Sequence, residues 1–154
     1  MLKKVARKTV RNRGGRFAIV ASKYNGRFVN AMLSEATATL KRANAEEIKV
    51  VRVPGAFEVP VVAAKLAKAA PGYSAIICLG VILRGATVHA QSISDVVSFA
   101  LGTIALQTET PVIHEVLLLE NEEQAKKRCL SKQHNRGAEA AQTALEMARL
   151  MKTL

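Results

Sequence analysis

The chain has no tryptophan, few aromatic residues (4% of its 154 positions) and only two cysteines. Two cysteines exclude a disulfide-rich secreted scaffold, so Cys78 and Cys129 are expected to be free thiols in a reducing compartment. No stretch is long and apolar enough to predict a membrane span. The basic N-terminal segment lacks the apolar run that a secretory signal needs. We therefore expect a cytoplasmic protein with one sizeable core.

Several motifs of well-known chemistry are also missing. The sequence contains no GxxxxGK[ST] and no GxGxxG, so neither a P-loop nor a dinucleotide-binding fold is indicated. It contains no GxSxG nucleophile motif. The three histidines are not spaced with the cysteines as metal ligands would be. These absences leave the turns between predicted strands and helices as the places to look for chemistry.

Positive charge is concentrated at the start of the chain. Seven of the basic residues, and no acid, fall in the first sixteen positions, and without them the formal net charge of +11 falls to +4. We predict a basic arm over residues 1–15 and a single domain over residues 16–154. The arm is interpreted either as a solvated tail or as a segment that binds nucleic acid or another anionic surface. No aromatic residues are interleaved with its charges, which does not favour nucleic acid.

Apolar runs and helical periods alternate along the rest of the chain. Strands are predicted over residues 16–22, 48–53, 75–83 and 111–118. Helices are predicted over residues 28–43, from 56 to about 69, from the turn after residue 83 to about 108, over 121–130, and over 138–151. Alternation of this kind predicts an α/β fold with a parallel sheet covered on both faces.

Polar and small residues follow three of these strands at their carboxyl ends. They are Tyr24-Asn25-Gly26, residues 54–58, and residues 84–89. In an open parallel sheet such turns share one edge, where ligands bind. Free N–H groups at the helix start near His89 form a natural anion site, and the imidazole could take a proton there. The other interpretation is a tight turn with a surface histidine. Glu58, likewise, is either a helix-capping carboxylate or an acceptor for ligand hydroxyls.

Two further groups allow more than one interpretation. His114 interrupts the fourth predicted strand, and a lone histidine in a strand is most often a satisfied core or interface residue. Lys126, Lys127 and Arg128 lie on a short charged helix, where such a run usually forms a solvated face.

Several stretches together resemble the 6,7-dimethyl-8-ribityllumazine synthase family of riboflavin biosynthesis. They are residues 17–25, 51–60, 80–89, 111–113, 135–139 and 144–148, and the motifs Pro-Gly-Ala-Phe-Glu and Arg-Gly-Ala-Thr-x-His are the most specific. The resemblance implies a flavodoxin-like three-layer sandwich with a four-stranded parallel sheet. It also implies a transferase that condenses 5-amino-6-(D-ribitylamino)uracil with 3,4-dihydroxy-2-butanone 4-phosphate, releasing phosphate and water without a cofactor or metal. The family assembles as pentamers, sometimes as decamers or sixty-subunit shells, with its active site between subunits.

The resemblance also implies roles for individual residues. Tyr24 would stack on the pyrimidine ring beside Asn25, and the backbone of residues 81–83 would meet the uracil edge. Residues 56–58 would hold the ribityl chain, residues 86–87 would bind phosphate, and His89 would move protons. From a neighbouring subunit, His114 would close the pyrimidine site and Arg128 would bind phosphate. The residues expected in the site are Tyr24, Asn25, Ala56, Phe57, Glu58, Val81, Ile82, Leu83, Ala86, Thr87, His89, His114 and Arg128.

Some positions depart from the family pattern. Phenylalanine is usual at His114, an aromatic residue and an acid are usual at Ala90 and Gln91, and lysine is usual at Arg136. These departures leave open a non-catalytic relative that binds a flavin-like or lumazine-like ligand as a carrier or regulator. A basic protein that binds nucleic acid through residues 1–16 is the other alternative, but it explains none of the three turns.

Overall fold

The computed structural model describes residues 14–85 and 88–154, and four strands in this part of the chain form one parallel sheet in the order β2-β1-β3-β4. Strands and helices alternate as the sequence pattern predicts. In chain order the elements are β1 (Arg16–Ser22), α1 (Gly26–Arg42), β2 (Glu47–Val53), the 3₁₀ helix η1 (Ala56–Glu58), α2 (Val59–Ala67), β3 (Ala75–Leu83), α3 (His89–Thr108), β4 (Val112–Leu119), α4 (Glu122–Ala125), the π-helix η2 (Lys126–Leu130) and α5 (Arg136–Met151).

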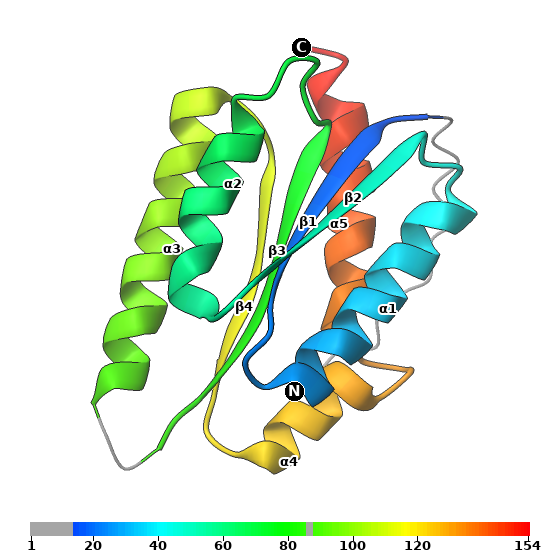
Figure 1. Cartoon of the computed structure of the whole chain (residues 1–154). Helices are drawn as coiled ribbons and strands as arrows, with labels where there is room; N and C mark the ends of the chain where they lie inside the picture. The colour runs from blue at the N-terminus through cyan, green and yellow to red at the C-terminus, as the bar shows by residue number, and fades with distance from the viewer. Residues whose placement is uncertain (1–13, 86–87) are drawn as a thin grey trace.

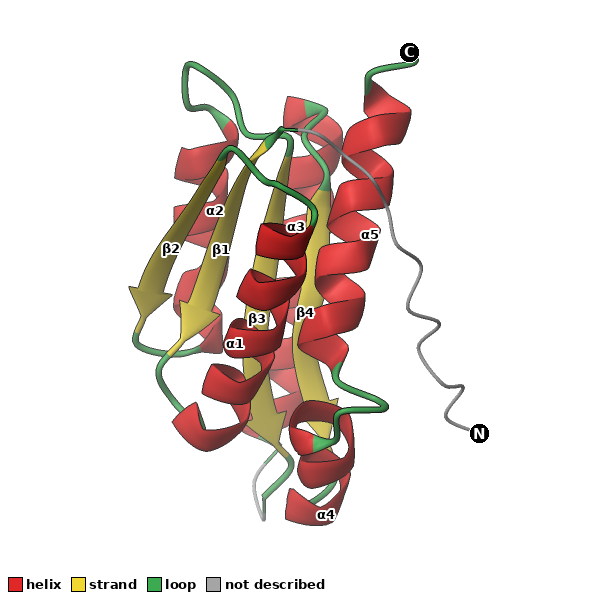
Figure 2. Cartoon of the chain, turned by 90° about the vertical axis from the view of Figure 1, so that its right-hand side faces the viewer, coloured by secondary structure: helices red, strands yellow, loops and turns green. Residues whose placement is uncertain are grey.

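Helices cover both faces of the sheet. Helices α1 and α5 pack together on one face, and α2 and α3 pack together on the other (Figure 1, Figure 2). The strand order and the three layers are those of a flavodoxin-like α/β fold, so the predicted fold class is confirmed.

The sheet separates two apolar cores. Successive residues of a strand point to opposite faces, so Phe17, Ile19 and Ala21 join the core under α1 and α5. Ala18 and Val20 join the core under α2 and α3. The two central strands, β1 and β3, are buried on both faces, which explains why each has the continuous apolar run of a parallel strand.

Strands β1 and β3 have the predicted bounds, but several helices do not. Helix α1 begins at Gly26, because Asn25 takes a left-handed conformation (φ 55°) and its carbonyl accepts the first helical N–H groups. The helix predicted from residue 56 begins as the 3₁₀ turn η1 before α2 proper. The helix predicted over residues 121–130 is divided into α4 and η2.

Helix α5 begins at Arg136, two residues before the predicted start, because Asn135 caps it. The Oδ1 atom of Asn135 accepts a 2.8 Å hydrogen bond from the N–H of Gly137, and its Nδ2 donates to the carbonyl of Cys129 over 2.6 Å. Gly137 lies against α1, where an added Cβ would stand 2.0 Å from the carbonyl oxygen of Met32. No residue with a side chain fits there, so this close approach fixes the first turn of α5.

Most of the predicted basic arm, residues 1–13, lies outside the described residues. In the described part of the chain, no helix is long and apolar enough to cross a membrane. Cys78 and Cys129 are free and buried, as expected, and burial raises the pKa of each thiol to about 12. Thiols with so high a pKa remain protonated and unreactive at neutral pH.

Candidate active site

A cavity of about 570 Å³ opens at the carboxyl edge of the sheet, where the three turns come together. Its volume is in the range of small-molecule sites. The predicted site residues that line it are Tyr24, Asn25, Ala56, Phe57, Glu58, Val81, Ile82, Leu83 and His89.

Backbone hydrogen bonds hold the first two turns together. The N–H of Lys23 donates to the carbonyl of Val53 over 2.7 Å, and the N–H of Tyr24 donates to the carbonyl of Pro54 over 3.0 Å. These bonds continue the β1–β2 ladder past the last strand residues. The turn that carries Tyr24 is therefore fixed against the turn that carries Glu58.

The end of β3 offers main-chain groups to the cavity. Strand β1 pairs with β3 only as far as Leu79, whereas β4 pairs with it as far as Leu83. The N–H of Arg84 donates to β4, so by the alternation of a strand the main-chain groups of Val81 and Leu83 face the other side, toward the cavity. Those of Ile82 face β4, and we infer that Ile82 contributes its side chain instead.

Glu58 stands at the N-cap position of α2, but its side chain makes no capping hydrogen bond. It is exposed, and its carboxylate lies beside Gly55, with Oε2 3.5 Å from the place that a Cβ on Gly55 would occupy. The carboxylate is therefore free to accept hydrogen bonds from a ligand in the cavity.

His89 is the first residue of α3, is exposed, and makes no hydrogen bond to the described residues. Arg84, which follows β3, donates from Nε to Glu120 over 2.9 Å and from Nη2 to Gln91 over 2.8 Å. Gln91 in turn donates to Asp95 over 2.8 Å. Gln91 is therefore bonded to Arg84 and Asp95, and the imidazole of His89 is left unpaired with these residues.

Four predicted site residues do not line this cavity in the described structure. Ala86 and Thr87 lie outside the described residues. His114 lies on β4 and Arg128 lies in η2, away from the cavity of their own subunit.

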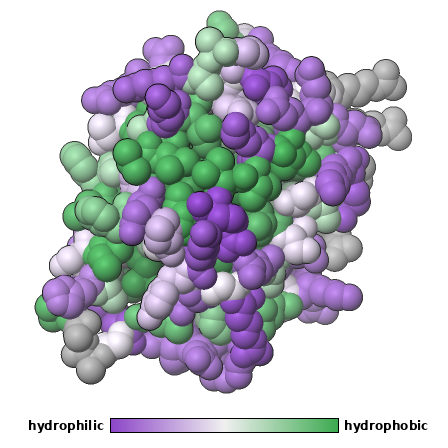
Figure 3. All heavy atoms as spheres, viewed as in Figure 1, coloured by the Kyte–Doolittle hydropathy of each residue, from purple (hydrophilic) through white to green (hydrophobic). Residues whose placement is uncertain are grey.

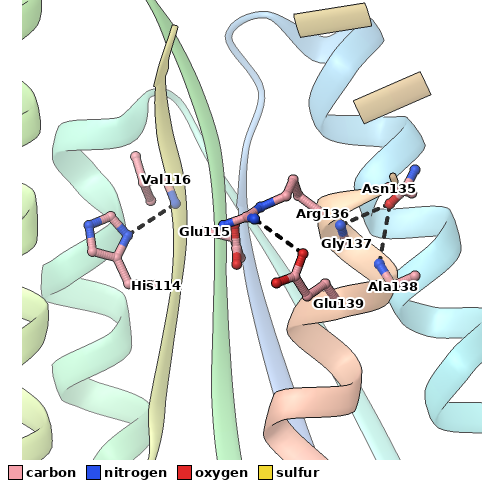
Figure 4. Close-up of polar contacts among 8 residues, drawn as sticks. All are labelled: His114, Glu115, Val116, Asn135, Arg136, Gly137, Ala138 and Glu139. Carbon is pink, nitrogen blue, oxygen red and sulfur yellow. Dashed lines mark hydrogen bonds and ion pairs between the residues drawn. The ribbon is translucent and has the colours of Figure 1, made fainter. Parts of the chain in front are cut away.

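His114 is held in one tautomer by two hydrogen bonds. Its Nδ1 accepts from the N–H of Val116 over 3.2 Å (Figure 4). The proton is therefore on Nε2, which donates to the Oγ of Ser98 over 2.7 Å. Burial lowers the pKa of His114, which favours the same neutral ring. The side chain thus joins β4 to α3.

Sequence reasoning missed a buried charged cluster on the opposite face of β4. Glu115 is 7% exposed, and its Oε2 accepts from Nε of Arg136 over 3.1 Å, while Nη1 of Arg136 donates to Glu139 over 3.1 Å (Figure 4). Burial raises the pKa of Glu115 to about 7, although Arg136 and Arg128 oppose the rise. An acid in the otherwise mainly apolar fourth predicted strand was the signal available in the sequence.

The outer face of α2 and α3 carries large apolar side chains. Figure 3 shows hydrophobic surface across the middle of this view and toward the side where these two helices lie. The exposed residues include Phe57, Val61, Val96, Phe99 and Leu106, and Phe99 and Leu106 are 79% and 83% exposed. An exposed apolar surface of this kind is typical of an interaction site.

A covered parallel sheet whose carboxyl edge holds a mainly apolar cavity with a few polar side chains is the architecture of a doubly wound α/β protein with a small-molecule site. The family model described as 6,7-dimethyl-8-ribityllumazine synthase matches residues 14–152. A 6,7-dimethyl-8-ribityllumazine synthase of Clostridium kluyveri is 41% identical over 143 residues, which are 92% of each chain. A solved structure, a de novo designed Rossmann fold protein, is 19% identical, covers 72% of this chain and 90% of its own, and has a TM-score of 0.39.

The chain belongs to the 6,7-dimethyl-8-ribityllumazine synthase family. It is therefore an enzyme, a transferase of riboflavin biosynthesis. The reaction of the family joins a ribitylaminouracil to a four-carbon ketone phosphate. Within the described residues, no group of three or more His, Cys, Asp or Glu side chains is placed to hold a metal ion.

Proposed function

We propose that the chain condenses 5-amino-6-(D-ribitylamino)uracil with 3,4-dihydroxy-2-butanone 4-phosphate at a site shared by two subunits. The observation that supports this most directly is that Tyr24, Glu58 and His89, from three separate turns, line one cavity. His114 and Arg128 lie outside that cavity, so they can take part only from a neighbouring subunit.

The uracil substrate is assigned to the cavity. Tyr24 is 74% exposed, so its ring has a free face on which a pyrimidine can stack. Main-chain groups of Leu83 meet the polar edge of the uracil, since the carbonyl of Val81 already accepts a hydrogen bond from Asn25. Ala56, Phe57 and Glu58 hold the ribityl chain, with the carboxylate of Glu58 accepting from its hydroxyls.

The ketone phosphate is assigned to the start of α3. A helix N-terminus presents free N–H groups and a partial positive charge, which together favour a phosphate. In the sequence, Ala86 and Thr87 come just before Val88, the N-cap residue of this helix. Arg128 of the neighbouring subunit supplies the full positive charge, and its planar guanidinium can bond two phosphate oxygens at once.

His89 moves protons between these two substrates. An amine of the uracil attacks the ketone, and loss of water gives an imine. Phosphate is then eliminated, and ring closure expels a second water. Each step transfers a proton, and one imidazole at the start of α3 can serve them in turn. Binding both substrates side by side accelerates the reaction independently of any proton transfer.

A second copy of the chain is the partner proposed for the apolar face of α2 and α3. A ring of identical subunits buries this face and brings each His114 and Arg128 toward a neighbour's cavity. The assembly proposed is the pentamer, alone or as part of a decamer or a sixty-subunit shell.

Incubation of the chain with both substrates tests the proposal, with lumazine fluorescence and released phosphate as readouts. Glu58→Gln should raise the KM for the ribitylaminouracil by roughly 10- to 100-fold, because a charged acceptor for hydroxyls is lost. Glu146→Gln, which removes an exposed acid of α5, is the control and should leave this KM unchanged. Failure to form either product, or a Glu58→Gln variant with the wild-type KM, would contradict the proposal.

A further inference from the structure

Glu115 is a carboxylate in a place that an apolar residue would fill. It lies on β4 between Ile113 and Leu117, which face the core under α1 and α5. Transfer of an ionised carboxylate into such surroundings is costly unless it is paired and hydrogen-bonded. Replacement of a buried ion pair by apolar residues is often neutral or stabilising. The pair that Glu115 makes is therefore better explained by what it orients than by the stability it adds.

The group it orients is the guanidinium of Arg136. Nε is bonded to Glu115 and Nη1 to Glu139, so two carboxylates from different elements fix the plane of the fork (Figure 4). Nη2 makes no hydrogen bond within residues 14–85 and 88–154, and Arg136 remains partly exposed. The guanidinium is thus held rigid with one amino group available for a further acceptor.

Arg128 lies beside this arrangement. Its positive charge lowers the pKa of Glu115, as does that of Arg136, whereas the negative charge of Glu139 raises it. Cys129 of η2 is a fourth titratable neighbour of Glu115. The hydrogen bond from Nδ2 of Asn135 to the carbonyl of Cys129 ties η2 to the start of α5. Arg128 in η2 and Arg136 in α5 therefore lie on two elements that this hydrogen bond joins directly.

We propose that Glu115 is a positioning residue for the phosphate substrate. Glu115 holds Arg136 so that the free Nη2 of Arg136 and the neighbouring Arg128 together face the phosphate bound in the adjacent subunit. This inference rests on the proposed function. Glu115 itself touches no substrate. Its effect reaches the phosphate only through Arg136. Loss of Glu115 should therefore weaken binding of the ketone phosphate and leave binding of the ribitylaminouracil unchanged.

The test uses the assembled full-length enzyme and the KM of each substrate, with inhibition by inorganic phosphate as a second probe. Glu115→Leu should raise the KM for the ketone phosphate and the inhibition constant of phosphate by about tenfold. The KM for the ribitylaminouracil should stay within about twofold of wild type. Glu115→Gln keeps an oxygen that accepts from Nε, so it should recover most of the loss. Glu123→Gln removes the exposed partner of Lys126 and is the matched control, with no change expected.

The outcomes separate the inference from the function on which it rests. A purely structural Glu115 would lower stability or change both KM values alike. If Arg128→Ala raises the KM for the ketone phosphate but Glu115→Leu does not, the inference is overturned and the proposed function stands. If Glu115→Leu does not assemble, Glu115→Gln is the test. A KM for the ketone phosphate raised by about two- to threefold, with the KM for the ribitylaminouracil unchanged, supports the inference. Wild-type KM values for both substrates, or a rise in both, overturn it. A wild-type enzyme that forms no lumazine overturns both.

Discussion

The side-chain amide of Asn25 donates a 2.7 Å hydrogen bond to the main-chain carbonyl of Val81, 56 positions away in the sequence. Asn25 ends the turn after β1, and Val81 lies in the part of β3 that β1 no longer covers. This one bond therefore joins the first of the three turns to the end of β3, which leads into the third. It also takes up one main-chain acceptor of β3 and leaves the groups of Leu83 for a ligand.

Asn25→Gly should isolate the contribution of that bond. Glycine adopts the left-handed conformation of Asn25 (φ 55°) without strain, so only the side-chain contact is lost. We expect the KM for the ribitylaminouracil to rise about three- to tenfold, the effect of one net hydrogen bond. Asn25→Ala should add backbone strain and lower the free energy of unfolding by about a further 1 kcal/mol. Steady-state kinetics and urea unfolding measure the two effects, and a wild-type KM in Asn25→Gly would refute this role.

His89→Ala should slow turnover without abolishing it. Proton transfer by a placed side chain is typically worth about 10²–10⁴-fold, so kcat should fall by on the order of 10² or more. The remaining rate comes from holding the substrates together, and both KM values should change little. Added imidazole should restore part of the rate. A variant as fast as wild type would remove the role assigned to His89.

The stability of the fold should depend on pH through Glu115. Burial raises the pKa of this carboxyl from 4.5 to about 7, so the folded chain binds a proton more tightly than the unfolded chain does. Between these two values the free energy of unfolding must therefore fall as pH rises, by up to about 3 kcal/mol from this group. Glu115→Gln does not titrate and should lose less stability over the same range. Urea unfolding at pH 5 and pH 7.5 compares the two, and equal losses would contradict the assignment.

Gly137→Ala should destabilise the protein by about 1–3 kcal/mol or more, because its Cβ has no space beside the carbonyl of Met32. Gly72→Ala is the matched control. A Cβ there meets only the carbonyl oxygen of Ala69, at 3.8 Å, an ordinary contact, so its stability should change by less than about 1 kcal/mol. Thermal or urea unfolding of the two variants measures the difference. Equal stabilities would mean that α1 and α5 can move apart at little cost.

Much of the fold could be predicted because the central strands are buried on both faces. Their continuous apolar runs predict β1 and β3 to the residue, and a parallel sheet then requires the three turns to share an edge. The start of α5 was predicted two residues late, because the cap at Asn135 was not recognised and the helix was placed after Gly137. The real constraint on Gly137 is the backbone of Met32, a tertiary contact that no local pattern reveals.

The charged cluster shows the same limit at the site. Glu115 could be noticed as an acid in an apolar strand, but its partner Arg136 is 21 residues away and is placed by the packing of α5. Likewise, the sequence does not show that the main-chain groups of Ile82 face β4. That follows only from the register of β3 with its two neighbours.

The most direct test of the shared site is to co-assemble His89→Ala and Arg128→Ala subunits. Each variant alone should be impaired at every site. If His89 and Arg128 act from different subunits, an equal random mixture should recover about one quarter of the wild-type specific activity, because that share of interfaces joins an intact His89 to an intact Arg128. A mixture no more active than the average of the two separate variants would contradict a site shared between subunits.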